Sequence, residues 1–223
     1  MRKAKISNNV IRRLPRYLRK LDDLADAGVE RISSGEMGRQ MGLTPSQIRQ
    51  DFSCFGEFGQ QGYGYNVEML RREMSVILGI SRRYNVILIG VGNLGRALLE
   101  NFGFERNGFN LLAAFDINSA IVGKELSHVT IRHAETLPEF VRGNKVDIAV
   151  LTVPRRAAQS MADAVTDCGI KAIWNFTNVE LSVSDPEVLM EDIHFSDSLL
   201  TLSYYLSEAE DAARGEETLE EKA

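Results

Sequence analysis

NVILIGVGNLGRALLENFGFERNGFNLLAAFD, residues 85–116, is the stretch that decides the fold of this chain. After Asn85 come four apolar residues, Val86 to Ile89, a run typical of a parallel strand buried on both faces. The glycine-rich segment GVGNLG, residues 90–95, follows at once and leads into a helical segment. A second strand, Leu111 to Phe115, ends at Asp116. We therefore predict the first strand, turn, helix and strand of a doubly wound α/β domain.

The turn has the GxGxxG spacing of dinucleotide-binding sites. Gly90 permits the turn, Gly92 lets backbone N–H groups approach a pyrophosphate at a helix N-terminus, and Gly95 lets that helix pack closely on the strand. Asp116, twenty-one residues after Gly95, is placed to accept hydrogen bonds from a ribose. The alternative is a plain tight turn beside an unrelated aspartate. The predicted cofactor contacts here are Gly90, Val91, Gly92, Asn93, Leu94, Gly95, Asp116 and Ile117.

The acid after the second strand also indicates which dinucleotide is bound. A carboxylate at Asp116 would repel a 2′-phosphate, and the next residues, Ile117 to Ser119, include no arginine to hold one. The sequence therefore favours NADH and NAD+ over their phosphorylated forms.

The alternation of strands and helices continues beyond Asp116. Strands are predicted over 129–131, 146–153 and 172–176, with helices over 135–141 and 155–168. Ligands of such sheets bind at the carboxyl ends of the strands, so we expect Thr152, Val153, Pro154, Asn175 and Thr177 to line the cofactor cleft. For Thr152 and Asn175, simple capping of a loop is an equal alternative.

The N-terminal third has the pattern of a helical DNA-binding domain. An amphipathic helix is predicted over residues 8–27, either kinked at Pro15 or beginning there. Ser33 and Glu36 form a capping box for a short helix that Gly42 ends, and Thr44 caps a second short helix with Pro45 at its first position. Two short capped helices joined by a tight turn indicate a helix-turn-helix.

The second of these helices presents residue types that read base edges. Arginine pairs with guanine, glutamine with adenine, and serine with either. A solvated polar face on an ordinary helix is the alternative. The predicted contacts on this helix are Thr44, Ser46, Gln47, Arg49 and Gln50.

Residues 54–65, CFGEFGQQGYGY, alternate glycines with aromatic residues. We interpret them as a hairpin whose aromatic side chains pack on the helices while its tip approaches a phosphate backbone, which makes the domain a winged helix-turn-helix. The tip carries glutamines instead of lysines, so its phosphate contacts would be hydrogen bonds more than ion pairs, and a smaller salt dependence of DNA binding is expected. The predicted contacts of this wing are Phe58, Gln60, Gln61, Gly62 and Tyr63.

The remaining segments set the domain boundaries. Asn66 caps a helix predicted over 67–78, and the domain boundary is expected near residues 79–84. A terminal amphipathic helix over 196–214 has more apolar surface than a small domain needs, which predicts dimerisation, with exchange of this helix between subunits as one form of it. We thus predict a DNA-binding domain at 1–80, a Rossmann-like NAD(H) domain at 84–195, a dimerisation helix, and a disordered tail at 215–223.

Charge is divided between the two parts of the chain. Residues 1–83 hold 15 Lys and Arg against 9 Asp and Glu, whereas residues 84–223 hold 11 against 22. This division fits a chain in which a basic module faces a polyanion and an acidic module has another function. No apolar run is long enough to span a membrane, and the basic N-terminus lacks the apolar core of a signal peptide, so we expect a cytoplasmic protein. Cys54 and Cys168 are expected to be inert thiols rather than a disulfide or a metal site.

Over nearly its whole length the chain resembles the redox-sensing transcriptional repressor Rex. The matching segments are RLPRYLRKL (13–21), ISSGEMG (32–38), QIRQDFSCFGEFGQQGYGYNVEML (47–70), VILIGVGNLG (86–95), AFDIN (114–118), LTVP (151–154) and IWNFT (173–177).

The resemblance implies a homodimer that binds palindromic operator DNA when NADH is scarce. NADH would then close the dimer and release the DNA. It also implies that Phe195 inserts beside the nicotinamide in the partner subunit. Two positions depart from the family pattern: relatives usually have Asp at the position of His194 and often Tyr at that of Asn101. In relatives that Asp contacts an arginine that aligns with Arg13, so this linkage is in doubt here, and His194 suggests a pH-sensitive response.

Two other functions compete with the repressor. A small NAD-dependent dehydrogenase would need a placed general acid and a substrate domain. The three histidines, His128, His133 and His194, are scattered, and no Tyr-x-x-x-Lys pattern occurs. We therefore expect no catalytic residues, and we expect no metal. An NAD-binding regulatory subunit, with the winged helix used for protein contacts, is the other alternative, and salt-dependent DNA binding would separate it from the repressor.

Overall fold

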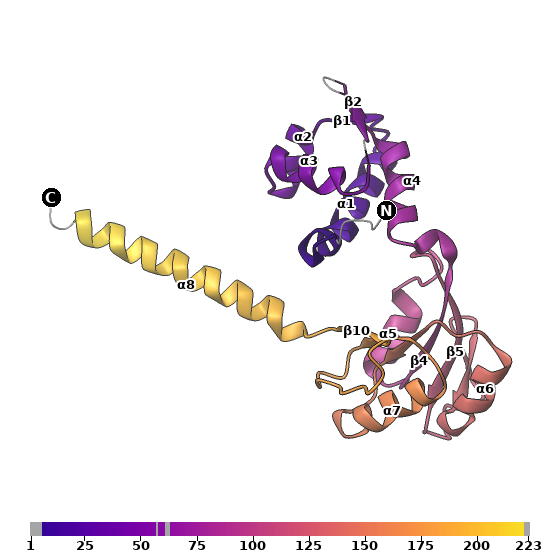
Figure 1. Ribbon diagram of the computed structural model, residues 1–223. Helices are drawn as coiled ribbons and strands as arrows, with labels where there is room; N and C mark the ends of the chain where they lie inside the picture. The colour runs from indigo at the N-terminus through magenta and orange to yellow at the C-terminus, as the bar shows by residue number, and fades with distance from the viewer. Residues whose placement is uncertain (1–5, 57, 61–62, 221–223) are drawn as a thin grey trace. The chain divides into compact units, whose positions relative to one another are not determined.

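The computed structural model describes residues 6–56, 58–60 and 63–220, and the chain divides into two compact units, Met1–Arg83 and Tyr84–Ala223. The first unit contains α1 (Asn8–Asp26), β1 (Arg31–Ile32), α2 (Ser34–Met41), α3 (Pro45–Ser53), β2 (Gly59–Gln60), β3 (Gly64–Asn66), α4 (Val67–Ile77) and the 3₁₀ turn η1 (Ile80–Arg82) (Figure 1). The predicted winged helix-turn-helix is confirmed: α2 and α3 follow one another directly, and β3 pairs antiparallel with both β1 and β2.

Local sequence signals explain where these helices begin. The side chains of Ser33, Thr44 and Asn66 accept hydrogen bonds from the backbone N–H groups three residues ahead, as predicted. Helix α1 is continuous and contains Pro15, with Ser7 as its N-cap, so the alternative in which the helix begins at the proline is wrong.

The core of the first unit forms where α1, α3, α4 and the small sheet meet. Tyr17, Phe52 and Tyr65 lie at its centre, with the ring of Phe52 edge-on to both tyrosines at centroid distances of 5.0 and 5.1 Å. Phe58 packs against this cluster from the wing. Phe55, Phe58 and Tyr65 of the glycine-rich segment thus fasten the wing to the helices, as expected, whereas Tyr63 is exposed.

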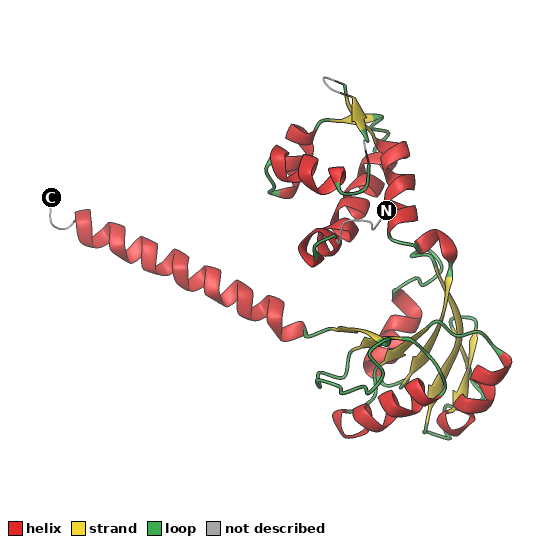
Figure 2. Ribbon diagram, in the orientation of Figure 1, coloured by secondary structure: helices red, strands yellow, loops and turns green. Residues whose placement is uncertain are grey.

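The second unit is built on one seven-stranded sheet. Its elements are β4 (Tyr84–Ile89), α5 (Asn93–Asn101), β5 (Phe109–Asp116), β6 (Glu125–Leu126), β7 (Val129–His133), η2 (Ala134–Thr136), α6 (Leu137–Gly143), β8 (Ile148–Leu151), α7 (Arg155–Asp167), β9 (Ala172–Asn175), β10 (Leu189–Asp192) and α8 (Phe195–Glu220). The strand order is β10-β9-β8-β4-β5-β7-β6, and every pairing is parallel except that of β6 with β7. Figure 2 shows these strands side by side with helices around them.

Each face of the sheet has its own core. Ile87 and Ile89 of β4 pack with residues of α6 and α7, whereas Val86 and Leu88 pack with Leu99 of α5. Alternate residues of one strand are therefore buried on opposite faces, which accounts for the unbroken apolar run. Because the chain runs outward from β4 through β5 and then returns to β8 on its other side, the order of strands reverses between β4 and β8, the place where such sheets bind ligands.

Several predicted boundaries differ from the structure. The predicted helix at 135–141 begins as the 3₁₀ turn η2 and continues as α6, and the edge strands β6 and β10 were not predicted. Helix α8 runs to Glu220, so the predicted disordered tail is wrong for residues 215–220, and residues 221–223 lie outside the described part. Among the described residues, none of the helices contains an apolar stretch of membrane-spanning length.

Candidate functional sites

The glycine turn after β4 has the geometry that close packing requires. Gly90 has a φ of +98°, and a Cβ there would lie 2.8 Å from the carbonyl carbon of Thr152. A Cβ on Gly95 would lie 2.0 Å from the carbonyl oxygen of Gly90. Neither position can accept a side chain without moving the backbone. The two glycines therefore allow α5 to lie close to the carboxyl ends of β4 and β8.

Gly92 lies in open space by contrast. A Cβ there would meet no atom within 4 Å, and its φ is −75°. It is the N-cap of α5, and no side chain among the described residues caps this helix. The uncapped N–H groups and the positive end of the helix dipole suit an anion such as a pyrophosphate, and the missing side chain leaves room for it.

Asp116, at the end of β5, is in contact with the same turn. Its Oδ2 accepts a hydrogen bond from the N–H of Val91 at 2.6 Å, and its Oδ1 accepts one from the N–H of Asn118 at 2.8 Å. A carboxylate oxygen can accept more than one hydrogen bond, so Asp116 can fix the turn and still receive ribose hydroxyls. The neighbouring Ile117 is exposed.

Thr152, the residue after β8, fastens the turn from the other side. Its hydroxyl lies 2.6 Å from the carbonyl oxygen of Gly90 and 3.2 Å from that of Ile89. A hydroxyl has a single proton, and the shorter contact uses it. Thr152 therefore positions the glycine turn, which agrees with the loop-capping alternative. Val153 and Pro154 follow it, and Pro154 is the N-cap residue of α7.

The contacts of Asn175, like those of Thr152, agree with the loop-capping alternative. Its side chain is fully buried. Nδ2 donates to the backbone oxygen of Val179 and to Oδ1 of Asp192, at 2.8 and 2.7 Å, and Oδ1 accepts from the N–H and the hydroxyl of Thr177. All four hydrogen-bonding positions of the amide are filled by protein, so Asn175 holds the loop after β9 and has no group left for a ligand.

Phe195 stands at the start of α8, where the chain leaves the sheet. The exposed fraction of this residue is 63%, and its ring centroid lies 6.1 Å from that of Phe176. Just before it, Nδ1 of His194 lies 2.8 Å from Oδ1 of Asn178. Every side chain of α8 that the structure describes is exposed, including Leu199, Leu200, Leu202, Tyr204, Tyr205 and Leu206.

Four of the predicted DNA contacts lie on α3: Ser46, Gln47, Arg49 and Gln50. Ser46, Arg49 and Gln50 are exposed, and Thr44 is used as the helix cap. The guanidinium of Arg49 donates to the hydroxyls of Ser34 and Ser46, at 2.9 and 3.2 Å. These contacts steady a long side chain while leaving it exposed.

On the wing, Tyr63 is 71% exposed, whereas Phe58 is partly buried and packs on the core, so its side chain supports the wing instead of facing outward. The backbone of Gln60 belongs to β2. Gln61 and Gly62 lie outside the described residues.

A buried carboxylate joins α3 to α1, and sequence analysis did not find it. Arg13 donates to both oxygens of Asp51, at 2.6 and 2.8 Å, and the hydroxyl of Tyr17 donates at 2.7 Å. Gln47 adds a fourth hydrogen bond at 2.8 Å. In relatives, an arginine that aligns with Arg13 contacts the Asp at the position of His194; here the guanidinium of Arg13 donates to Asp51 within the first unit.

The ionisation of this cluster follows from its contacts. Burial alone raises the pKa of Asp51, but the hydrogen bonds from Arg13, Tyr17 and Gln47, together with the charge of Arg13, outweigh burial and hold the pKa below its usual value. Burial and the hydrogen bond to Asp51 raise the pKa of Tyr17. Asp51 is therefore charged and Tyr17 neutral near pH 7.

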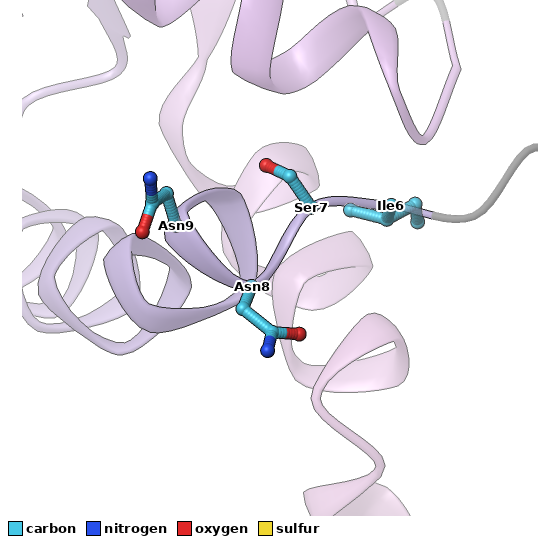
Figure 3. Close-up of a pocket in the computed structure, with 4 residues that line it drawn as sticks. All are labelled: Ile6, Ser7, Asn8 and Asn9. Carbon is cyan, nitrogen blue, oxygen red and sulfur yellow. The ribbon is translucent and has the colours of Figure 1, made fainter.

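The other features of the described residues add little to these candidate sites. A hollow at the start of α1 is lined by Ile6, Ser7, Asn8 and Asn9, and the Ser7 hydroxyl in it is used as the cap of α1 (Figure 3). No group of three or more His, Cys, Asp or Glu side chains in the described ranges could hold a metal ion. Cys54 and Cys168 are both free.

Comparison with known proteins matches both units. The family described as "CoA binding domain" matches residues 81–179, and the family described as "Putative DNA-binding protein N-terminus" matches residues 5–53. The redox-sensing transcriptional repressor Rex of Thermoanaerobacter pseudethanolicus is 50% identical over 94% of this chain and 93% of its own. The protein of the same name from Clostridium tetani is 46% identical over 94% of this chain and 99% of its own.

Solved structures agree with these relatives. A crystal structure of RSP in complex with β-NAD+ and operator DNA has a TM-score of 0.86 and 48% identity, covering 95% of this chain and 97% of the other. A crystal structure of RSP in complex with β-NADH has a TM-score of 0.87 and 46% identity, covering 95% and 99%. In each case the similarity spans both units.

Proposed function

The chain belongs to the Rex family of redox-sensing transcriptional repressors, and from that premise we propose that it binds operator DNA as a homodimer and releases the DNA when NADH binds. One observation carries the proposal. A single chain joins a winged helix-turn-helix, whose α3 exposes Ser46, Arg49 and Gln50, to a glycine turn held by Asp116 and Thr152. A repressor acts where the DNA is, so we place the protein in the cytoplasm.

NADH and NAD+ are the ligands that fit the second unit. The open surface at Gly92 gives a pyrophosphate access to the N-terminus of α5, and the carboxylate of Asp116 lies at the adjoining strand end. The two cofactors differ by one positive charge on the nicotinamide ring. If the apolar side chains of Phe195, Val153 and Pro154 surround the ring, they favour its neutral, reduced form, because burial of an unpaired charge is costly.

The homodimer is supported by the exposed apolar surface of α8. Leu199, Leu202 and Leu206 are each more than half exposed, and monomeric proteins seldom expose apolar patches of this kind. We expect Leu199→Glu combined with Leu206→Glu to halve the mass measured by light scattering, without lowering the unfolding temperature of the first unit. An unchanged mass would count against dimerisation through α8.

We infer that the protein is a regulator and not an enzyme. Relatives that cover nearly the whole chain are named as transcriptional repressors. His194 directly precedes Phe195, and its Nδ1 lies 2.8 Å from Oδ1 of Asn178, so that ring nitrogen already has a partner within the protein. Incubation of the full chain with NADH and a panel of carbonyl compounds should leave the absorbance of NADH unchanged.

A gel-shift series tests the proposal as a whole. The probe is a duplex selected by the full chain from a randomised pool, titrated with NADH, NAD+ and NADPH. We expect NADH to release the duplex at the lowest concentration. Release by NADPH at the same concentration would contradict the role given to Asp116, and a chain that selects no duplex would remove the repressor proposal.

A further inference from the structure

We propose that Asp51 is a positioning residue for base recognition: its buried carboxylate fixes the amide of Gln47 so that the amide offers one acceptor and one donor to an adenine. The inference rests on the proposed DNA binding and adds to it the group that sets the geometry of one contact. Four hydrogen bonds converge on the carboxylate of Asp51.

The carboxylate has no capacity left over. Oδ2 accepts from Nε of Arg13 and from the hydroxyl of Tyr17, while Oδ1 accepts from Nη2 of Arg13 and from Nε2 of Gln47. The side chain is fully buried, so water cannot replace a missing partner. An ionised carboxylate accepts about four hydrogen bonds, and protein supplies all four.

These contacts fix α3 against α1. Arg13 and Tyr17 are four residues apart in α1 and so lie on the same face of that helix. Both reach the single carboxylate of Asp51 in α3, and the contact of Arg13 is bidentate, which restricts the angle between the groups as well as their distance. The rotation of α3 about its own axis is therefore set by a polar contact in addition to the apolar core.

The same carboxylate decides which way the amide of Gln47 points. Asp51 can only accept, so the nitrogen of the amide must face it, and one of the two N–H groups is used there. The carbonyl oxygen and the second N–H remain. A glutamine that pairs with adenine needs one acceptor for the N6 amino group and one donor for N7. Gln47 retains both groups.

The position of Gln47 suits that contact. It lies in the first turn of α3, directly after Pro45 and Ser46, and it is only partly buried. In helix-turn-helix proteins the N-terminal residues of the second helix contact base edges. Arg49 and Gln50 are exposed on the same helix, but neither is hydrogen-bonded to Asp51. Gln47 is therefore the base-contacting candidate whose side-chain orientation is fixed by a buried carboxylate.

The experiment measures one hydrogen bond to one base. A duplex selected by the full chain from a randomised pool is remade with 7-deazaadenine at each adenine in turn, which removes only the N7 acceptor. We expect wild type to lose roughly 3- to 10-fold in affinity at one adenine of each half-site, the value of one net hydrogen bond. Gln47→Ala should bind less tightly overall and show no further loss at that adenine.

Two variants separate positioning from stability. Asp51→Asn can donate as well as accept, so it no longer dictates the orientation of Gln47, and the 7-deazaadenine loss should fall below half the wild-type value. Tyr17→Phe is the matched control: it removes a different bond to the same carboxylate and should keep the full loss. If Asp51→Asn does not fold, as judged by thermal unfolding, Asp51→Glu serves, because it keeps the charge and moves the oxygens.

The outcomes distinguish this inference from the proposed function. A wild type that binds no selected duplex would defeat DNA binding itself. A wild type that binds the duplex with no loss at any 7-deazaadenine, or an Asp51 variant that keeps the full loss, would overturn only the role given to Asp51 and Gln47.

Discussion

Gly92→Ala separates the binding of the cofactor from the folding of its domain. A methyl group on Gly92 meets no atom within 4 Å, and the backbone there, with φ −75° and ψ −163°, is open to alanine. Alanine is a poorer N-cap than glycine, but it also restricts the unfolded chain. These effects oppose one another, so we expect the free energy of unfolding to change by less than about 1 kcal/mol.

The effect on NADH should be much larger. The methyl group occupies the surface through which the pyrophosphate reaches the N–H groups at the start of α5. Loss of one hydrogen bond to a charged group costs about 1.5–3 kcal/mol, which raises the Kd for NADH about 10- to 150-fold. The concentration of NADH that releases the operator should rise by the same factor, since DNA binding without cofactor is unchanged.

The assay combines the fluorescence of bound NADH with thermal unfolding. Gly143→Ala is the matched control, because a Cβ at Gly143 also meets no atom within 4 Å, and Gly143 is the last residue of a different helix, α6. It should bind NADH as wild type does. Gly95→Ala should lose stability instead, because its Cβ would lie 2.0 Å from a carbonyl oxygen. Wild-type NADH affinity in Gly92→Ala would refute the reasoning.

Three further changes test other contacts. Thr152→Val removes the hydroxyl that holds Gly90, and we expect a loss of about 1 kcal/mol in unfolding free energy and weaker NADH binding by fluorescence titration; unchanged values would show that the contact has no role. Arg49→Ala should cost about 1–3 kcal/mol in affinity for operator DNA and much less for random DNA; equal losses by gel shift would make it a phosphate contact only. The folded pKa of Asp51 is lowered, so its ionisation stabilises the fold above the ordinary carboxyl pKa of about 3.9, and this contribution is lost as the pH falls through the lower, folded value. Asp51→Asn should therefore be less stable than wild type near pH 7 and approach it in acid, as followed by urea unfolding; a constant difference would contradict this.

The features that the sequence predicted best depend on neighbours in the chain. The roles of Gly90 and Gly95 follow from their spacing, and the structure shows the close contacts that exclude a side chain at both. The N-caps Ser33 and Thr44 act three residues away from themselves. Patterns of this kind are complete within a short window, so their physical cause can be inferred without the fold.

The features that were missed depend on residues far apart in the sequence. Arg13 and Asp51 are 38 positions apart, and nothing near either one indicates the other. For Asn175, which lies at a strand end, the sequence left a cleft position and a loop cap equally open, and hydrogen bonds to Val179 and to the distant Asp192 decide for the loop cap. Strand β10 was not predicted because three of its four residues are exposed, as is usual for an edge strand, and its sequence has no alternation of apolar and polar residues.

The central claim is that one chain couples occupancy of a cofactor site to release of DNA, and this coupling must act in both directions. The most direct test is a titration of NADH against the full chain with and without saturating operator duplex. We predict that the duplex raises the Kd for NADH by the same factor by which NADH raises the Kd for the duplex, with ~100-fold corresponding to about 2.7 kcal/mol. Equal NADH affinities with and without the duplex would contradict the account.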